Sequence, residues 1–75
     1  MGLNDYLQEF CAKYGYTGKI SINDLGEYIV HMENDLECSE STLSEHEYQI
    51  IKENQIKELL ELMSKGIEER TKLRK

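Results

Sequence analysis

The chain has 75 residues, of which 9 are lysine or arginine and 15 are aspartate or glutamate, and its formal net charge is −6. This length predicts a single domain over residues 1–75, with a small margin of stability because a short chain buries only about 60% of its unfolded surface. The apolar runs are too short for a membrane span, and none follows Met1 as a secretory signal would require. We therefore expect a cytoplasmic protein whose two cysteines, Cys11 and Cys38, are free thiols.

The first predicted element is a helix over residues 4–14. Asn4 is a suitable N-cap, Asp5 lies in the first turn, where the helix dipole favours an acid, and Gly15 can end the helix in the left-handed conformation. The apolar residues at helical spacing form one stripe, which consists of Leu3, Leu7, Phe10, Cys11 and Tyr14.

The second predicted element is a helix over residues 22–36. Ser21 and Asp24 have the spacing of a capping box, and Ile20 and Leu25 that of a hydrophobic staple. The apolar residues that follow at spacings of three and four are Ile22, Leu25, Ile29, Met32 and Leu36, with Tyr28 beside them. Gly26 would permit close approach of another helix, and the serine-rich stretch 38–44 is expected to be a polar loop.

The third predicted element is a long helix over residues 45–73. Leu43, Ser44, Glu47 and Tyr48 repeat the pattern of a staple and a capping box at its start, and Gly66 is the only breaker inside it. Three pairs at i,i+4 spacing mark a solvated face, namely Glu53–Lys57, Glu61–Lys65 and Glu68–Lys72. Together the three elements predict an all-α fold, with two short helices packed on a long carboxy-terminal helix.

The predicted helix lengths imply an uncovered apolar surface. The third helix would span about 40 Å and the first two only about 16 and 22 Å, so the short helices cannot cover the long one. Exposed apolar surface of this kind is typical of an interaction site, and we expect a homodimer. The predicted self-association residues are Ile56, Leu59, Leu60, Met63 and Ile67. The alternative is that the long helix bends or ends at Gly66 and the short helices fold lower down.

Charge is spread unevenly along the chain. Residues 33–47 contain six acids and no lysine or arginine; the acids are Glu33, Asp35, Glu37, Glu40, Glu45 and Glu47. This acidic segment would repel nucleic acid and could dock on a basic protein surface. The alternative is that the acids keep a loop soluble and favour helix starts, which suits Glu45 and Glu47. Residues 70–75 form a basic tail, which is either a frayed end that touches phosphate or ordinary capping of a last helical turn.

The sequence contains no pattern that is typical of a metal site or a catalytic site. Cys11, His31, Cys38 and His46 are too widely spaced to present a pair of zinc ligands. Residues 13–24 resemble a calcium loop at Gly18, Ile20 and Asp24, but Lys13, Gly15 and Thr17 stand where oxygen ligands are required. Neither cysteine has a basic neighbour, and there is no glycine-rich phosphate loop. We therefore expect no cofactor and no enzymatic activity.

These observations favour a small acidic protein-binding module that acts as an adaptor or inhibitor of another protein. The frequent Ile, Lys, Asn and Glu have AT-rich codons, which is compatible with a regulator from a phage or mobile element. If the acidic segment contributes, binding should weaken with salt. One alternative is a helix-turn-helix DNA-binding regulator, although the exposed positions of the second predicted helix offer no cation to phosphate. Another alternative is a structural or assembly subunit.

Overall fold

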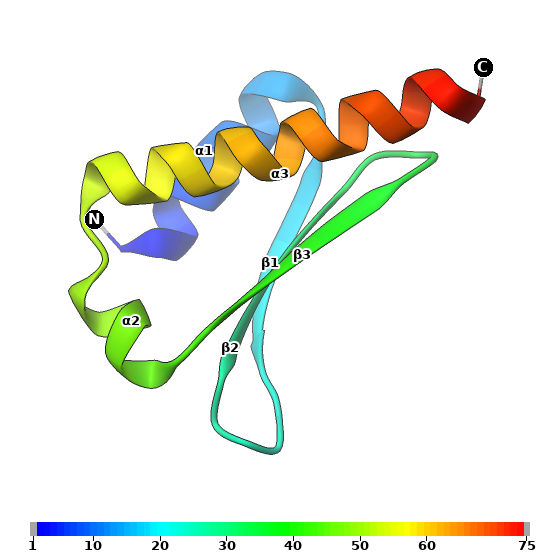
Figure 1. The fold of residues 1–75 in the computed structure, drawn as a ribbon. Coiled ribbons are helices and arrows are strands. Elements are labelled where there is room, and N and C mark those ends of the chain that lie inside the picture. The colour runs from blue at the N-terminus through cyan, green and yellow to red at the C-terminus, as the bar shows by residue number, and fades with distance from the viewer. Residues whose placement is uncertain (1, 75) are drawn as a thin grey trace.

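The computed structural model describes residues 2–74, and it has an α+β fold (Figure 1). Its elements in chain order are α1 (Leu3–Tyr14), β1 (Thr17–Ile22), β2 (Tyr28–Glu33), β3 (Cys38–Leu43), α2 (Glu45–Ile50) and α3 (Glu53–Arg74). The strands form one antiparallel sheet in the order β1-β2-β3, and α1 and α3 cover one face of it. The prediction of an all-α helical bundle is therefore wrong.

The first predicted helix is confirmed as α1, with a small change at its start. Its N-cap is Gly2 rather than Asn4, and the Asp5 carboxylate accepts a hydrogen bond of 3.1 Å from the Gly2 N–H. Gly15 ends the helix at φ 80°, in the left-handed conformation that favours glycine. The side chains of Leu3, Leu7 and Cys11 are buried, as the apolar stripe predicts, whereas Tyr14 is exposed.

The predicted second helix is instead a β-hairpin. Asn23 begins its turn: the Oδ1 atom of Asn23 accepts hydrogen bonds from the N–H groups of Leu25 and Glu27, at 2.9 and 3.0 Å. The bond from the Asn23 N–H to the Glu27 carbonyl closes a three-residue loop over residues 24–26. Gly26 has φ 78°, so it supplies the left-handed residue that such a loop requires. Ser21 lies in β1 and Asp24 in the turn, so the predicted capping box and the staple do not form.

The predicted polar loop over 38–44 is mostly the third strand. β2 and β3 pair in a register that sets Glu33 opposite Cys38 and His31 opposite Glu40. Asn34 orders the connecting turn, because its Oδ1 accepts hydrogen bonds from the N–H groups of Leu36 and Glu37, at 2.9 and 2.7 Å. Serine and threonine suit this strand because it lies at an edge of the sheet, with every second residue exposed.

The predicted third helix begins where expected but is divided into two helices. Its capping box is confirmed: the Ser44 Oγ accepts from the Glu47 N–H at 3.1 Å, and the Glu47 carboxylate accepts from the Ser44 N–H at 3.0 Å. The chain then becomes extended at Ile51, and Lys52 starts α3 by donating its N–H to the Gln55 side chain at 2.9 Å. Gly66 does not interrupt α3.

The core lies between the sheet and the two helices α1 and α3. Its buried apolar side chains are Leu3, Leu7, Cys11, Val30, Met32, Ile56, Leu60, Met63 and Ile67. Val30 and Met32 alternate along β2, so they mark the face of the sheet that the helices cover. The opposite face is polar and carries Lys19, His31 and Glu40.

Candidate functional site

An apolar groove separates α2 from α3. It is bounded by the end of β3, by α2 and by the first half of α3, and its volume is about 440 Å³. Its lining residues are Leu43, Glu47, Ile50, Ile51, Gln55, Glu58, Leu59 and Leu62. The groove exists because the extended backbone at Ile51 lets α2 diverge from the axis of α3 instead of continuing it.

Two large apolar side chains of this groove are open to solvent. Ile50 on α2 is 58% exposed, and Leu62 on α3 is 69% exposed. Leu59 is partly buried and packs on the core beneath them. Full burial of one such side chain is worth about 1.5–3 kcal/mol, so covering both would favour association with a partner.

The charges that line the groove are all negative. Glu47 and Glu58 are the only ionisable residues among its eight lining residues, and no lysine or arginine of residues 2–74 lines it. Hydrogen bonds from the backbone and the side chain of Ser44 lower the pKa of Glu47, which stays ionised at neutral pH. The groove therefore combines apolar surface with negative charge.

The predicted self-association residues do not form an exposed surface. Ile56, Leu60, Met63 and Ile67 are buried in the core of a single chain, and Leu59 lies in the groove. The premise that these side chains face water is wrong, because the sheet covers the part of α3 that two short helices could not reach. Self-association stays a prediction, but it needs another surface.

The residues that sequence reasoning missed are the groove residues Ile50 and Leu62. A signal for them exists in the sequence. The buried residues of α3 follow spacings of 4, 3 and 4 from Ile56 to Ile67, and Leu62 falls outside that stripe. Ile50 and Ile51 are adjacent, so one helix face cannot bury both of them.

The six acids of the predicted acidic segment do not form one cluster. Glu33 and Glu40 lie on the polar face of the sheet beside His31, at 3.7 and 3.0 Å from its ring nitrogens. Asp35 lies in the β2–β3 turn, and Glu45 and Glu47 lie in the first turn of α2. The segment is therefore spread over two strands, a turn and a helix start, and only Glu47 reaches the groove.

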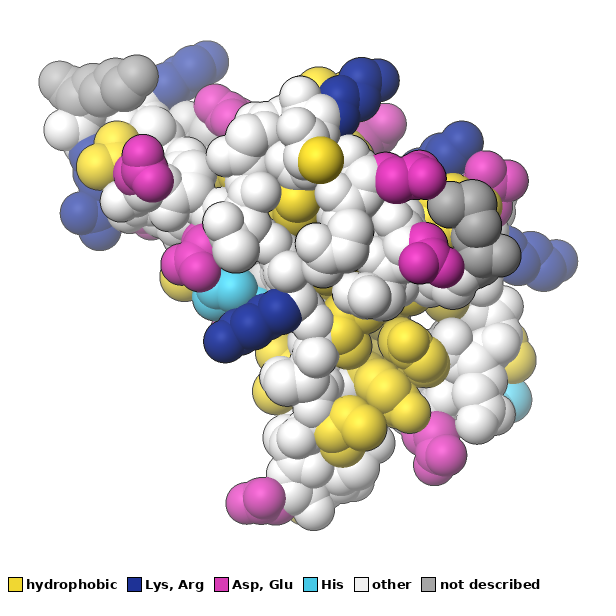
Figure 2. Space-filling model, turned by 180° about the vertical axis from the view of Figure 1, so that it is seen from behind, with side chains coloured by type: hydrophobic (Ala, Val, Ile, Leu, Met, Phe, Trp, Pro, Cys, Tyr) yellow, Lys and Arg dark blue, Asp and Glu magenta, His cyan; other side chains and the backbone are white. Residues whose placement is uncertain are grey.

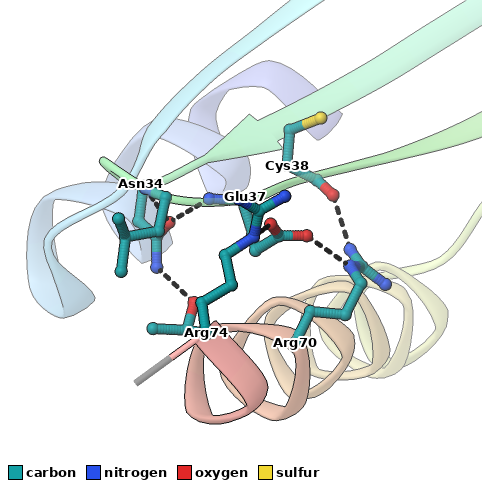
Figure 3. A network of polar contacts seen from close by, with 7 residues as sticks. Asn34, Glu37, Cys38, Arg70 and Arg74 are labelled. Carbon is teal, nitrogen blue, oxygen red and sulfur yellow. Dashed lines mark hydrogen bonds and ion pairs between the residues drawn. The ribbon is translucent and has the colours of Figure 1, made fainter.

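Glu37 is held by two arginines of the predicted basic tail, as Figure 3 shows. The Nε of Arg70 lies 3.1 Å from its carboxylate, Arg74 contacts the same carboxylate, and Arg70 also donates to the Cys38 carbonyl. Next to them, the Asn34 amide donates to the hydroxyl of the buried Thr71 at 3.1 Å. These contacts fasten the end of α3 to the β2–β3 turn, so this part of the tail is not frayed. Lys75 lies outside the described residues.

A second pocket lies between α1 and α3 and has a volume of about 250 Å³. Its lining residues are Tyr6, Glu9, Phe10, Lys13, Tyr14, Lys57, Leu60 and Glu61. It is smaller than the groove, and its two lysines and two glutamates give its lining no net charge. A partner of definite charge would therefore be favoured less here than in the groove.

The remaining chemistry of the described residues is limited. Within residues 2–74, no group of three or more His, Cys, Asp or Glu side chains could hold a metal ion. Burial raises the pKa of the Cys11 thiol, which makes it a poor nucleophile, whereas Cys38 is exposed. In the same residues, none of the helices combines the length and the hydropathy that a membrane crossing demands.

Comparison with known proteins gives no relative from which a function could be transferred. No protein-family model matches the chain, and no curated protein and no solved structure is significantly similar to it.

Proposed function

We propose that this chain is a non-catalytic protein-binding module, an adaptor or inhibitor, whose α2–α3 groove binds an amphipathic helix with basic flanks. The observation that carries the proposal is the pair of exposed side chains, Ile50 and Leu62, in a groove whose charged residues are all acidic. A cytoplasmic location belongs to the proposal, since both cysteines are free thiols.

The shape of the groove suits a helix as its occupant. Two helices form its long walls, and an amphipathic helix fills such a groove with apolar side chains at spacings of three and four residues. The volume of about 440 Å³ has room for a few anchors of this kind. Because association and side-chain ordering offset much of the burial energy, we expect about micromolar affinity.

The charge of the groove determines which helix should bind. Glu47 and Glu58 lie beside the apolar surface, and lysines or arginines that flank the anchors of the partner would face them. These carboxylates are exposed, so their attraction is screened by salt. We expect affinity to fall as ionic strength rises, with the apolar contacts retained.

A pair of designed peptides tests the proposal. Both have leucines at helical spacing; one has lysines at the flanking positions, and the other has glutamates at the same positions. The lysine peptide should bind and shift the backbone NMR signals of Ile50 and Leu62, whereas the glutamate peptide should bind at least about tenfold more weakly.

A matched pair of variants locates the binding site. Leu62→Ser should weaken binding of the lysine peptide, whereas Leu73→Ser should not, although Leu73 is also an exposed leucine of α3. Equal binding of both peptides, no binding, or signals that shift only outside the groove would each refute the proposal.

The helix-turn-helix alternative loses its structural basis. Its second helix would occupy residues 22–36, and these residues form the end of β1, the β1–β2 turn, β2 and most of the β2–β3 turn. The helix that was predicted over residues 22–36 is therefore absent from residues 2–74, which removes the main support for this alternative.

A further inference from the structure

β1 is an open edge of the sheet, and its free backbone groups can be assigned. The Asn23 N–H donates to the Glu27 carbonyl at 3.0 Å, which fixes the phase of the β1–β2 ladder. Because hydrogen-bonded pairs alternate in an antiparallel ladder, Ser21 and Lys19 also bond to β2, and the backbone groups of Ile20 and Ile22 point away from the sheet. The Gly18 carbonyl agrees with this phase, since it accepts a bond from the Gln8 side chain.

The same two residues present apolar side chains next to this free edge. Ile20 and Ile22 face the helix side of the sheet, and Ile22 is 61% exposed. The end of the hairpin extends beyond α1 and α3 (Figure 1), which leaves an apolar hollow between β1 and α2 (Figure 2). The stacked rings of Tyr28 and Tyr48, whose centroids are 3.9 Å apart, connect the sheet to α2 at this place.

We propose that two copies of this chain pair through β1, antiparallel, about a twofold axis at Ser21. In this register Ile20 of each copy is opposite Ile22 of the other, and the outward N–H and C=O groups of both residues find partners. The four isoleucine side chains lie on the helix side and extend the two hollows into one apolar surface. Lys19 of each copy is opposite Asn23 of the other, so no like charges meet.

β1 is a strand at which charge does not oppose a second copy. The net charge of the chain is −6, so most of its surface would repel another copy. β1 contains one lysine and no acid, and it can therefore meet its own equivalent without acid facing acid. An exposed apolar edge strand is also a site of unwanted pairing unless it is covered, and twofold pairing covers it. This inference does not depend on the α2–α3 groove.

Sedimentation velocity of the full chain, from about 1 μM to about 1 mM, tests the proposal. Wild type should form dimers, and Ile22→Lys should raise the dimer dissociation constant roughly tenfold or more, because lysines replace apolar side chains in the interface. Leu25→Lys is the matched control: it makes the same change of charge at a residue that is 84% exposed but lies in the turn. Its dissociation constant should stay near that of wild type.

Hydrogen exchange on the wild-type chain gives a second readout that needs no variant. The amides of Ile20 and Ile22 should be protected only at concentrations where dimers form, whereas the Ser21 amide should be protected throughout. A monomer over the whole range, a dimer indifferent to Ile22→Lys, or a dimer lost instead in Leu62→Lys would overturn the proposal. Failure of the peptide titration at the groove would leave these results unchanged, so the two proposals can fail separately.

Discussion

Two neighbouring residues of α3 give a strong test of how this helix lies on the sheet. Met63 is 3% exposed and Leu62 is 69% exposed, so the same substitution should unfold the chain at one position and have little effect on stability at the other. We consider Met63→Glu and Leu62→Glu, which introduce the same charge into the same helix one residue apart.

The magnitude of the effect at Met63 follows from its burial. Loss of a buried methionine side chain costs about 2–5 kcal/mol, and a carboxylate forced into that site adds several kcal/mol more. A domain has about 0.05–0.15 kcal/mol of stability per residue, or about 4–11 kcal/mol for 75 residues. Met63→Glu should therefore be largely unfolded at 25 °C. Leu62→Glu should lie within about 0.5 kcal/mol of wild type, because it changes an exposed side chain.

Urea unfolding followed by circular dichroism measures both variants. A well-folded Met63→Glu would show that α3 does not pack on the sheet in the way described. An unfolded Leu62→Glu would show that Leu62 is a core residue, and the groove would then lose its exposed wall. If both variants fold and only the oligomeric state changes, the long helix would be an intermolecular surface, as the sequence first suggested.

Three further outcomes follow from the packing and the pKa values. Gly18→Ala should destabilise the chain by about 1–3 kcal/mol in urea unfolding, because the new Cβ would lie 2.7 Å from the Cys11 Sγ. Cys38→Ser should remove the fast phase of thiol labelling, since Cys11 is buried and burial raises its pKa; a fast phase that persists would contradict this. Burial and the hydrogen bond to Glu68 raise the pKa of Tyr16 from 10.0 to about 12. In the folded chain Tyr16 keeps its phenol proton to a higher pH than in the unfolded chain. The contribution of this group to the free energy of unfolding is therefore fully present below pH 10 and is lost as pH rises towards 12. Tyr16→Phe should remove this part of the alkaline decline, and an unchanged slope of stability against pH would refute the assignment.

The elements that sequence reasoning predicted correctly are those fixed by local hydrogen bonds. The helix stop at Gly15 and the capping box of Ser44 and Glu47 each involve residues within one helical turn. Such signals can be recognised in the sequence because no distant part of the chain has to be placed first.

The apolar residues of the hairpin fit two periods, so their pattern also predicts a helix. The helical spacing is that of Ile22, Leu25, Ile29 and Met32. Val30 lies outside that helical stripe, although it is fully buried. Tyr28, Val30 and Met32 alternate with exposed or half-buried residues, which is the period of a strand. Asn23 and Gly26 are also typical turn residues, and they favour a hairpin over a capping box that lacks its usual glutamate.

The division of the long helix at Ile51 has no comparable local signal. Neither glycine nor proline is near it, and the sequence continues with good helix formers. The break accompanies tertiary packing: Tyr48 in α2 and Ile51 in the extended link both pack against the core that contains Ile56 of α3. The groove arises from this break, so it could not be predicted before the sheet was known.

The acidic segment shows how a fold redistributes charge that looks continuous in a sequence. Glu37 forms ion pairs with both Arg70 and Arg74, which lie more than thirty residues away in the chain. Its charge is compensated within the molecule and cannot recruit a partner. Glu47 belonged to the same run, but it lies beside exposed apolar surface with Glu58, a residue that the linear charge pattern had not singled out. Under the proposed function, the acids expected to contribute to recognition are those next to apolar surface that water still reaches. Substitution of Glu47 and Glu58 should therefore alter the salt dependence of peptide binding more than substitution of Glu37.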